Sequence, residues 1–441
     1  MHVAALEIHS YKSFLRTVIL PFSPNLNIFI GPNNCGKTNV LDAIDFLTHP
    51  QKDPRRLHHH RAQLLLTLRL TAEEQELIRT TELVTALGRN YSVTMQDAHG
   101  QSLPENASGH LSSRIKMLTY DDFSDLERIE EDYTLMAERH PERFKQMTAL
   151  LLEHFPEVKS INSIVDVDSD TYGTVAVGAK SITIERLGGG FRRVLVMLMY
   201  ALHPDYSVVL IDEPEIHLHP GLIKRLLKIF NSGMTNQLIV TSHSPLFINA
   251  YTIPHVYRVL KDEQGSHVYS LAQQPGHLNQ QRLVQEINAD NMELFFADKV
   301  LLVEGVSDRI LMRGLIDRFY TGPYDIKVIH TQGKTNIESY IELMRIFHIP
   351  YLVMLDRDAL SAVAGQFGMH VGRHPSPDLY EQLRARHVAV LDNGSIEQNY
   401  PRRYQRKDSK PLNALHAAAN ITPGEYASDA MRNLRTIIDQ L

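Results

Sequence analysis

A glycine-rich turn between an apolar strand and a helix constrains the fold of this chain more than any other segment. Residues 26–30 form an apolar run, and residues 38–47 have the spacing of an amphipathic helix. Between them, two glycines separated by four residues are followed by lysine and threonine, the pattern of a phosphate-binding loop. The pattern predicts an α/β fold and assigns phosphate contacts to Gly31, Asn33, Asn34, Gly36, Lys37 and Thr38.

The residue types of this loop suit a nucleoside triphosphate. Glycines let backbone N–H groups approach phosphates at the N-terminus of the following helix. In such a loop Lys37 reaches the β- and γ-phosphates, and the hydroxyl of Thr38 ligates Mg²⁺. The motif alone is short enough to occur by chance, so the prediction needs further residues of the same chemistry.

Two later motifs supply those residues. The apolar run Val208–Ile211 ends in Asp212, which can hold Mg²⁺ through water, and in Glu213, which can polarise the attacking water. His243 follows the next apolar run and can sense the γ-phosphate. The alternative is an ordinary strand–loop–helix series with incidental polar residues, which the order and spacing of the three motifs disfavour. We therefore predict that the chain binds ATP and Mg²⁺.

The order of these motifs resembles the ATP-binding-cassette superfamily, in its chromosome-maintenance and DNA-repair branch. Residues 187–193 stand at the position of that family's signature loop, and residues 214–220 resemble its D-loop. The resemblance implies that two copies close head to tail, with each signature loop capping the partner's ATP. Gly188 replaces the usual signature serine, so a hydroxyl contact is lost, whereas the N–H groups of Gly188, Gly189 and Gly190 can still bind phosphate. Slow or partner-dependent hydrolysis is expected.

Acidic residues follow apolar runs in the second half of the chain as well. Glu304 and Asp308 follow one such run, and Asp356 and Asp358 follow another. Because the carboxyl ends of parallel strands meet at one edge of a sheet, these carboxylates are expected to gather there. Clustered carboxylates repel each other unless cations lie between them, which predicts one or two Mg²⁺ or Mn²⁺ ions. The alternative is that each acid caps a helix or ends a strand on a solvated face.

The spacing of these acids resembles a Toprim domain, as in topoisomerases, DnaG-type primases and repair nucleases. Residues 332–334 resemble that family's glycine turn, with glutamine at a position where glycine is more usual. The resemblance implies two-metal phosphodiester cleavage, with Asp308, Asp356 and Asp358 as ligands and Glu304 as a further ligand or the general base. A topoisomerase also needs a nucleophilic tyrosine on a separate DNA-gripping domain, and no segment of this chain is large enough to supply one. A primase needs a zinc-binding module that a single cysteine cannot build. Hydrolysis of a phosphodiester is the reaction that remains.

An ATPase region followed by a Toprim domain resembles the OLD (overcoming lysogenisation defect) family of nucleases over nearly the whole chain. The family implies further metal ligands in a Ser-x-Glu motif, which Ser395 and Glu397 match. It also implies a basic residue near the metals, for which the candidates are Arg402, Arg403, Arg406, Lys407 and Lys410. Members include phage-encoded nucleases and anti-phage effectors, some of which work with a helicase or with a retron reverse transcriptase and its RNA–DNA. Such a partner is among the expectations here.

Apolar runs divide the chain into two α/β regions. We expect an ATPase domain over residues 1–285, with a helical insertion at about 120–157, and a Toprim domain over residues 296–441. Strands of the first region are expected at 3–8, 26–30, 63–70, 91–95, 161–167, 174–177, 181–185, 208–211 and 238–241. Strands of the second region are expected at 299–303, 326–329, 351–355 and 388–391.

Composition bounds the compartment and the charge of any partner. The lone Cys35, the lack of a signal pattern at the N-terminus and the lack of a membrane-length apolar run indicate a reducing cytoplasm. The net charge of −6 requires any DNA-binding surface to be a local patch. Residues 55–61 and 402–407 are basic candidates, and a solvated loop is the alternative for each.

These patterns together predict an ATPase, dimeric or of higher order, coupled to a metal-dependent DNA endonuclease in phage defence or DNA processing. The state of the bound ATP would set the arrangement of the ATPase domains and so control DNA access. The main rival is an ATPase sensor or scaffold whose inactive Toprim domain recruits or restrains a separate effector. The complete set of acids argues against it. A chromosome-tethering ATPase would need a long coiled coil, and the predicted insertion at 120–157 is too short.

Overall fold

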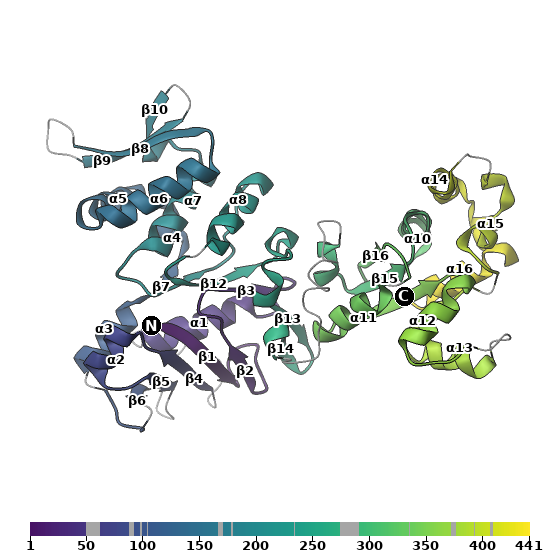
Figure 1. Cartoon of the computed structure of the whole chain (residues 1–441), viewed down its shortest axis with the longest axis horizontal. Coiled ribbons are helices and arrows are strands. Elements are labelled where there is room, and N and C mark those ends of the chain that lie inside the picture. Colours follow the sequence, from purple (N-terminus) through teal and green to yellow (C-terminus); the bar gives the residue numbers. More distant parts are fainter. Residues whose placement is uncertain are drawn as a thin grey trace. The chain divides into compact units, whose positions relative to one another are not determined.

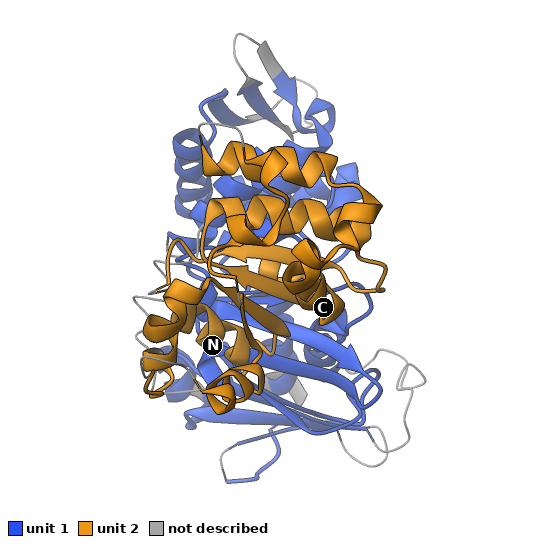
Figure 2. Ribbon diagram, turned by 90° about the vertical axis from the view of Figure 1, so that its right-hand side faces the viewer, with its two compact units in different colours: residues 1–275 blue, residues 276–441 orange. Residues whose placement is uncertain are grey.

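The protein comprises two compact units, Met1–Pro275 and Gly276–Leu441, each described by itself (Figure 1, Figure 2). The computed structural model describes residues 1–49, 62–87, 92–97, 99–103, 105–165, 171–177, 180–232, 234–273, 291–334, 336–371, 376–391, 393–405 and 409–441. The basic segment 55–61 and the candidates Arg406 and Lys407 lie outside the described residues. Most of the segment around the predicted domain boundary, residues 274–290, lies outside them too.

A six-stranded sheet forms the centre of unit 1, with strand order β14-β13-β3-β12-β11-β7 (Figure 1). Its strands are β3 (Leu26–Ile30), β7 (Ile115–Leu118), β11 (Val208–Ile211), β12 (Gln237–Ser242), β13 (Val256–Asp262) and β14 (Gly265–Ser270). All neighbouring pairs are parallel except β13 and β14. Every residue of β3, β11 and β12 is buried, as the continuous apolar runs predict for strands covered on both faces.

A five-stranded antiparallel sheet packs over helix α1 (Lys37–Thr48), which also contacts the six-stranded sheet. In sheet order the strands are β2 (Val18–Pro21), β1 (His2–His9), β4 (Gln63–Arg69), β5 (Glu82–Leu87) and β6 (Val93–Asp97), and helices α2 (Ala72–Ile78) and α3 (Glu105–Ser113) accompany them. The buried amide of Gln237 joins β12 to this layer. It accepts from the N–H of Val3 at 2.8 Å and donates to the carbonyls of Val3 at 2.9 Å and Ser23 at 2.7 Å.

Helices and a small sheet follow β7 in the chain. They are α4 (Tyr120–Ser124), α5 (Leu126–Arg139), α6 (Pro141–His154), the sheet β10 (Lys180–Thr183), β9 (Thr171–Val177), β8 (Val158–Val165), and then α7 (Gly189–Leu202) and α8 (Pro220–Asn231). Ile129, Tyr133 and Met136 form the buried stripe of α5, as their helical spacing predicts. The strand predicted at 181–185 is wrong at its end, because residues 184–186 form a 3₁₀ turn.

A four-stranded parallel sheet, in the order β16-β15-β17-β18, forms the centre of unit 2. The strands are β15 (Lys299–Val303), β16 (Ile326–His330), β17 (Tyr351–Leu355) and β18 (Val388–Val390), as the apolar runs predict. The helices are α10 (Val306–Phe319), α11 (Ile337–Ile346), α12 (Leu360–Gln366), α13 (Pro377–Arg384), α14 (Lys410–Asn420), α15 (Pro423–Tyr426) and α16 (Arg432–Asp439). Among the described helices of both units, none is long and apolar enough to cross a membrane.

Helices α10 and α14 approach each other closely. A Cβ built on Gly314 would lie 2.6 Å from the Cβ of Ala418, so only glycine fits there without moving the helices apart. Asp308 lies in the first turn of α10, and Lys410 is the first residue of α14. The packing of these two helices therefore fixes the positions of the Asp308 and Lys410 backbones relative to each other.

Candidate nucleotide and metal sites

The loop after β3 depends on residues in the left-handed region of the backbone map. Gly31, Asn34 and Gly36 have φ values of 150°, 60° and 108°. A Cβ on Gly31 would collide with the carbonyl oxygen of Val259, and one on Gly36 would lie 2.6 Å from the hydroxyl of Ser266. The two glycines are therefore required both by conformation and by the close approach of the β13–β14 hairpin.

The residues expected to contact phosphate and Mg²⁺ lie together around this loop. The ammonium of Lys37 is 5% exposed and donates to the carbonyls of Gly31 at 3.0 Å and Pro32 at 2.9 Å. The hydroxyl of Thr38 donates to the carboxylate of Asp212, at 3.1 and 3.2 Å from its two oxygens. The structure thus brings together the two residues predicted to bind Mg²⁺, although they come from distant segments. Asn33 and Asn34 are exposed on the same loop.

Thr241 organises the two acids that follow β11. Its hydroxyl donates to Asp212 and accepts the N–H of Glu213 at 3.1 Å. Glu213 has a φ of 47°, a conformation that costs energy in a non-glycine residue, and a guanidinium N–H of Arg193 donates to its carbonyl at 3.3 Å. Burial raises the pKa of Asp212, while hydrogen bonds from Thr241 and Thr38 oppose the shift. A cation beside Asp212 would stabilise the charged form.

Glu215 holds His243 in place beside Glu213. One oxygen of Glu215 accepts the Ser242 hydroxyl at 2.7 Å and the N–H of His243 at 2.8 Å. The Nδ1 atom of His243 lies 3.5 Å from Glu213 and 3.4 Å from Glu215. Glu215 lies in the segment that resembles a D-loop and Thr241 ends an expected strand, and neither residue is predicted from the sequence to belong to the site. Their positions, at the ends of neighbouring strands, were the signal that could have identified them.

The three glycines predicted to act as a signature loop begin helix α7. Gly188 is its N-cap, and Gly189 and Gly190 form its first turn. A Cβ on Gly188 or Gly189 would meet nothing within 4 Å, whereas one on Gly190 would lie 3.1 Å from the carbonyl oxygen of His217. The first two glycines therefore face open space, and the third packs against the segment that resembles a D-loop.

The acids of unit 2 converge at the carboxyl ends of β15 and β17, which are adjacent in the sheet. Glu304, Asp356 and Asp358 each offer a carboxylate oxygen within 4.8 Å of the others. The N–H of Asp356 donates to Glu304 at 3.0 Å, which fixes one carboxylate against the next strand. Asp308 lies beside this group and accepts the N–H of Gly305 at 2.9 Å.

Burial and mutual repulsion raise the pKa values of three acids in this cluster. Burial is the largest cause that raises the pKa of Asp356 to about 7, and repulsion from Asp308, Glu304 and Asp358 adds to it. Burial and the charge of Glu397 raise the pKa of Asp308 to about 6, although the Gly305 N–H opposes the shift. Burial also raises the pKa of Glu304.

One oxygen of this cluster has no protein partner. The Oδ1 atom of Asp356 is buried and makes no hydrogen bond. A buried oxygen of this kind is costly unless it meets a proton or a cation. Carboxylate oxygens are hard ligands, which suit Mg²⁺ and Mn²⁺. The donor set of Glu304, Asp308, Asp356 and Asp358 therefore fits divalent cations.

Lys410 stands out among the basic candidates near the acids. Its ammonium lies 3.1 Å from Glu397 and exerts an attractive field on Asp308 and Asp356. Burial opposes the charge of Glu397, but hydrogen bonds from Ser395 and Lys410 outweigh it and hold the pKa of Glu397 below its ordinary value. Ser395 thus orients Glu397.

The two other described candidates are placed differently. The guanidinium of Arg403 pairs with Glu425 at 2.7 Å and donates to the hydroxyl of Tyr404 at 2.6 Å. Arg402 is exposed in the short 3₁₀ turn of residues 402–404. Of the described candidates, Lys410 is therefore the one whose ammonium is shown to bear on the acids.

The turn at residues 332–334, which follows β16, contacts the backbone of Glu304. Gln332 has a φ of 57° and Gly333 a φ of 126°, so the glutamine adopts the left-handed conformation that glycine usually supplies. The N–H of Gly333 donates to the carbonyl of Glu304 at 3.2 Å. The departure from the family's glycine pattern therefore leaves the backbone of the turn intact.

We expect Asp356→Asn to stabilise the metal-free protein at high pH. The pKa of Asp356 is about 7 in the folded protein and 3.8 ordinarily, so between these pH values the unfolded chain ionises more readily than the folded one. The wild type therefore loses stability as pH rises through this range. The difference in Tm between variant and wild type should therefore grow from pH 5 to pH 7 and level off above. At this domain size about 1 kcal/mol corresponds to roughly 2–4 °C in Tm.

The measurement is a set of thermal melts in chelator across this pH range. Glu381→Gln, which changes an exposed carboxylate of α13, serves as the control, and its Tm difference from the wild type should show no such trend. Excess Mg²⁺ or Mn²⁺ should abolish the advantage of Asp356→Asn, because the cation then stabilises the ionised wild type. A pH-independent difference would contradict the electrostatic account of the cluster.

Three family descriptions match this chain in sequence order. Residues 2–97 match the RecF/RecN/SMC N-terminal domain, and residues 95–249 match an AAA domain family whose description names the AbiEii toxin of a type IV TA system. Residues 295–358 match the TOPRIM domain of overcoming lysogenization defect protein-like proteins. The predicted order, an ATPase region followed by a Toprim domain of the OLD type, is confirmed.

Curated relatives include several nucleases. The chain is 28% identical over 189 residues to the OLD nuclease of Thermus scotoductus, covering 40% of this chain and 36% of the relative. It is 25% identical over 242 residues to the endonuclease GajA of Bacillus cereus, covering 44% and 35%. It is 25% identical over 169 residues to the Old nuclease of Escherichia phage P2, covering 36% and 28%. The matches thus span about a third of the length of these relatives.

A solved structure shows the same fold for the ATPase region. The SMC head bound to the C-winged helix domain of ScpA has a TM-score of 0.50 and 15% identity, covering 62% of this chain and 99% of that one. The predicted α/β fold class, a P-loop ATPase with a C-terminal Toprim domain, is confirmed by this likeness together with the family matches.

Proposed function

We propose that this chain, which matches an ATPase family over residues 95–249 and the OLD-like TOPRIM domain over residues 295–358, is an ATP-hydrolysing, divalent-metal-dependent DNA endonuclease. The observation that carries the nuclease half is the convergence of Glu304, Asp356 and Asp358 within 4.8 Å, with a buried oxygen of Asp356 left without a partner. A role in phage defence, as an effector, is part of the same proposal.

In the Toprim site each residue has a distinct task. Glu304, Asp308, Asp356, Asp358 and Glu397 would hold the metals. Bound Mg²⁺ or Mn²⁺ supplies Lewis-acid stabilisation of phosphate and lowers the pKa of water. Glu304 is fixed by the N–H of Asp356, and because burial raises its pKa, its ionised carboxylate would be a stronger base for accepting a proton from water. Ser395 orients Glu397, and Lys410 supplies the positive charge that a scissile phosphate requires.

In the ATPase site the loop and the two acids divide the work. The N–H groups at the start of α1 and the ammonium of Lys37 would bind the phosphates of ATP, and Thr38 with Asp212 would hold Mg²⁺. Glu213, fixed in its left-handed conformation, would orient the attacking water, and His243 lies beside it at 3.5 Å. His243 is therefore positioned to respond to charge near Glu213.

A second copy of this chain completes the proposal. Gly188 and Gly189 face open space at the N-terminus of α7, where helix N–H groups favour anions. In head-to-tail dimers of similar ATPases this turn meets the partner's ATP, and we assign it the same role here. The ATP-bound state would then set the arrangement of two copies and control DNA access to the Toprim sites.

Plasmid cleavage by the full chain tests the proposed function. The substrates are supercoiled, linear and single-stranded DNA, each with Mg²⁺, Mn²⁺ or chelator and with or without ATP. We expect cleavage that requires the divalent cation. If DNA stays intact under every condition while ATP is hydrolysed, the rival holds, namely an ATPase sensor whose Toprim domain is a scaffold.

Replacing Lys410 with alanine should slow cleavage about 10- to 100-fold, less than the 10²–10³-fold cost of removing a buried donor, because the Lys410 side chain is 70% exposed. Lys410→Arg should restore part of the rate, since it keeps the charge beside Glu397. Arg403→Ala, which breaks the pair with Glu425 instead, serves as the matched control and should retain the wild-type rate. Equal losses in Lys410→Ala and Arg403→Ala would refute the assignment.

A further inference from the structure

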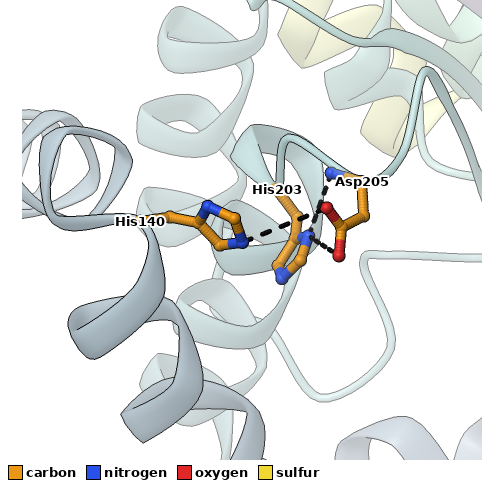
Figure 3. A group of neighbouring side chains, drawn as sticks. All are labelled: His140, His203 and Asp205. Carbon is orange, nitrogen blue, oxygen red and sulfur yellow. Dashed lines mark hydrogen bonds and ion pairs between the residues drawn. The ribbon is translucent and has the colours of Figure 1, made fainter.

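Two histidines and an aspartate converge where the helical arm, α5 and α6, packs against helix α7 (Figure 3). His140 lies between α5 and α6, His203 ends α7, and Asp205 follows in the turn before β11. One ligand atom from each residue lies within 4.8 Å of the other two. Figure 3 shows both imidazole rings and the carboxylate directed toward a common point.

The distances between the side chains of this group are too long for hydrogen bonds and close to those of ligands that share an ion. His140 Nε2 lies 4.0 Å from one oxygen of Asp205, and His203 Nδ1 lies 3.8 Å from the other. Tetrahedral ligands with bonds of about 2.0–2.2 Å lie roughly 3.3–3.6 Å apart. Both separations are thus within about 0.7 Å of that geometry, a shift that side-chain rotation can supply.

The orientation of the rings also fits a shared ligand. The N–H of Asp205 donates to Nδ1 of His203 at 3.3 Å, so this nitrogen is the unprotonated one of the ring, and a bound cation would replace that long hydrogen bond. The same nitrogen lies 3.8 Å from a carboxylate oxygen of Asp205, so a cation between the two atoms would be attracted to both. The rings of His140 and His203 are 5.2 Å apart and inclined at 74°, which lets each point a nitrogen inward without a steric clash.

We propose that His140, His203 and Asp205 form a Zn²⁺ site that fastens the helical arm to helix α7. Two imidazoles and one carboxylate are the ligands of a borderline-soft ion, in contrast to the all-oxygen set of the Toprim acids. Asp205 is 69% exposed, so the fourth position opens to water. Because α7 begins at Gly189 and leads to the strand that ends beside Asp212, the ion would join the arm to the ATPase site's own helix.

Zinc titration of the full chain, in excess Mg²⁺ that occupies the oxygen sites, tests the proposal. The chain also has three consecutive histidines at 58–60, so every protein in the series carries alanine at these positions. His203→Ala and Asp205→Asn should each weaken Zn²⁺ binding by at least the roughly 10- to 100-fold that loss of an outer-shell partner costs. The matched control is His267→Ala, which removes the imidazole of a separate pair with Asp262 at 3.1 Å and should leave Zn²⁺ binding unchanged.

Two further readouts separate a metal site from a folding defect. Asp205→Asn alters an exposed side chain, and its thermal melt in chelator should match that of the parent protein. Co²⁺ bound at a tetrahedral site with two nitrogen ligands should give visible absorption bands, which should vanish in His203→Ala. Zn²⁺ should also slow amide exchange in α5 and α6 of the parent but not of Asp205→Asn. Unchanged Zn²⁺ affinity in folded His203→Ala and Asp205→Asn would overturn the proposal. Rates of amide exchange in α5 and α6 of the parent that do not change with Zn²⁺ would overturn it too.

Discussion

Asp356→Asn is expected to abolish metal-dependent DNA cleavage, lowering its rate by at least about 10³-fold. The substitution keeps the shape of the side chain and the backbone N–H that donates to Glu304. It removes the negative charge of a carboxyl group whose pKa is raised to about 7 by burial and by neighbouring acids. It also replaces one of the two carboxylate oxygens with an amide nitrogen. A cation that needs Asp356 would then be bound too weakly to support the reaction. The measurement is the initial rate of plasmid nicking in Mn²⁺ and in Mg²⁺.

Controls distinguish loss of the site from loss of the protein. Asp325→Asn changes an acid of the same unit that is 59% exposed, and it should cleave like the wild type. Asp356→Asn should retain its full rate of ATP hydrolysis, because its site and the phosphate loop belong to different units. Cleavage by Asp356→Asn at the wild-type rate would rule out a nuclease site built on these acids.

Lys37→Ala is expected to remove ATP turnover, with a loss of at least about 10³-fold. The ammonium of Lys37 is 5% exposed and donates to two carbonyls of its own loop, so the side chain both carries the charge for the phosphates and braces the turn. Alanine provides neither. The measurements are ATP binding by calorimetry and phosphate release under saturating ATP and Mg²⁺.

Lys224→Ala, which removes an exposed lysine of helix α8, is the matched control, and the ATP turnover of this variant should equal that of the wild type. The same Lys37→Ala protein also tests the coupling between the two activities. If cleavage depends on ATP in the wild type, it should become insensitive to ATP in Lys37→Ala. Normal ATP hydrolysis by Lys37→Ala would exclude the phosphate loop as the nucleotide site.

Most of the acidic cluster of unit 2 could be located from the sequence, because its residues sit at the ends of apolar runs. Glu304 and Asp356 follow β15 and β17, and these strands are parallel neighbours, so their carboxyl ends meet whatever the surrounding helices do. The phosphate loop was predictable for a similar reason, since its glycines are demanded by local backbone angles. In both cases the chemistry depends on a short segment and on one general rule of sheet geometry.

Other features depended on contacts that no local pattern reveals. Lys410 and Arg403 were equal candidates in the sequence, and they differ because Lys410 begins a helix packed on α10 whereas Arg403 pairs with Glu425. Thr241 and Glu215 acquire their roles by hydrogen bonds to the neighbouring strand. Such partners lie far away in the chain, and their pairing follows from packing and not from spacing.

By itself the sequence located the phosphate loop and the strand-end carboxylates of this protein, because both are recognisable from residue type and local geometry. Only the tertiary structure decided which basic side chain bears on the acids, and how Glu213 is held in a strained conformation. It alone brought His140 to His203 and Asp205. The physical reason is that charge and coordination act through space over a few ångströms, whereas sequence patterns report only neighbours along one strand or one helix.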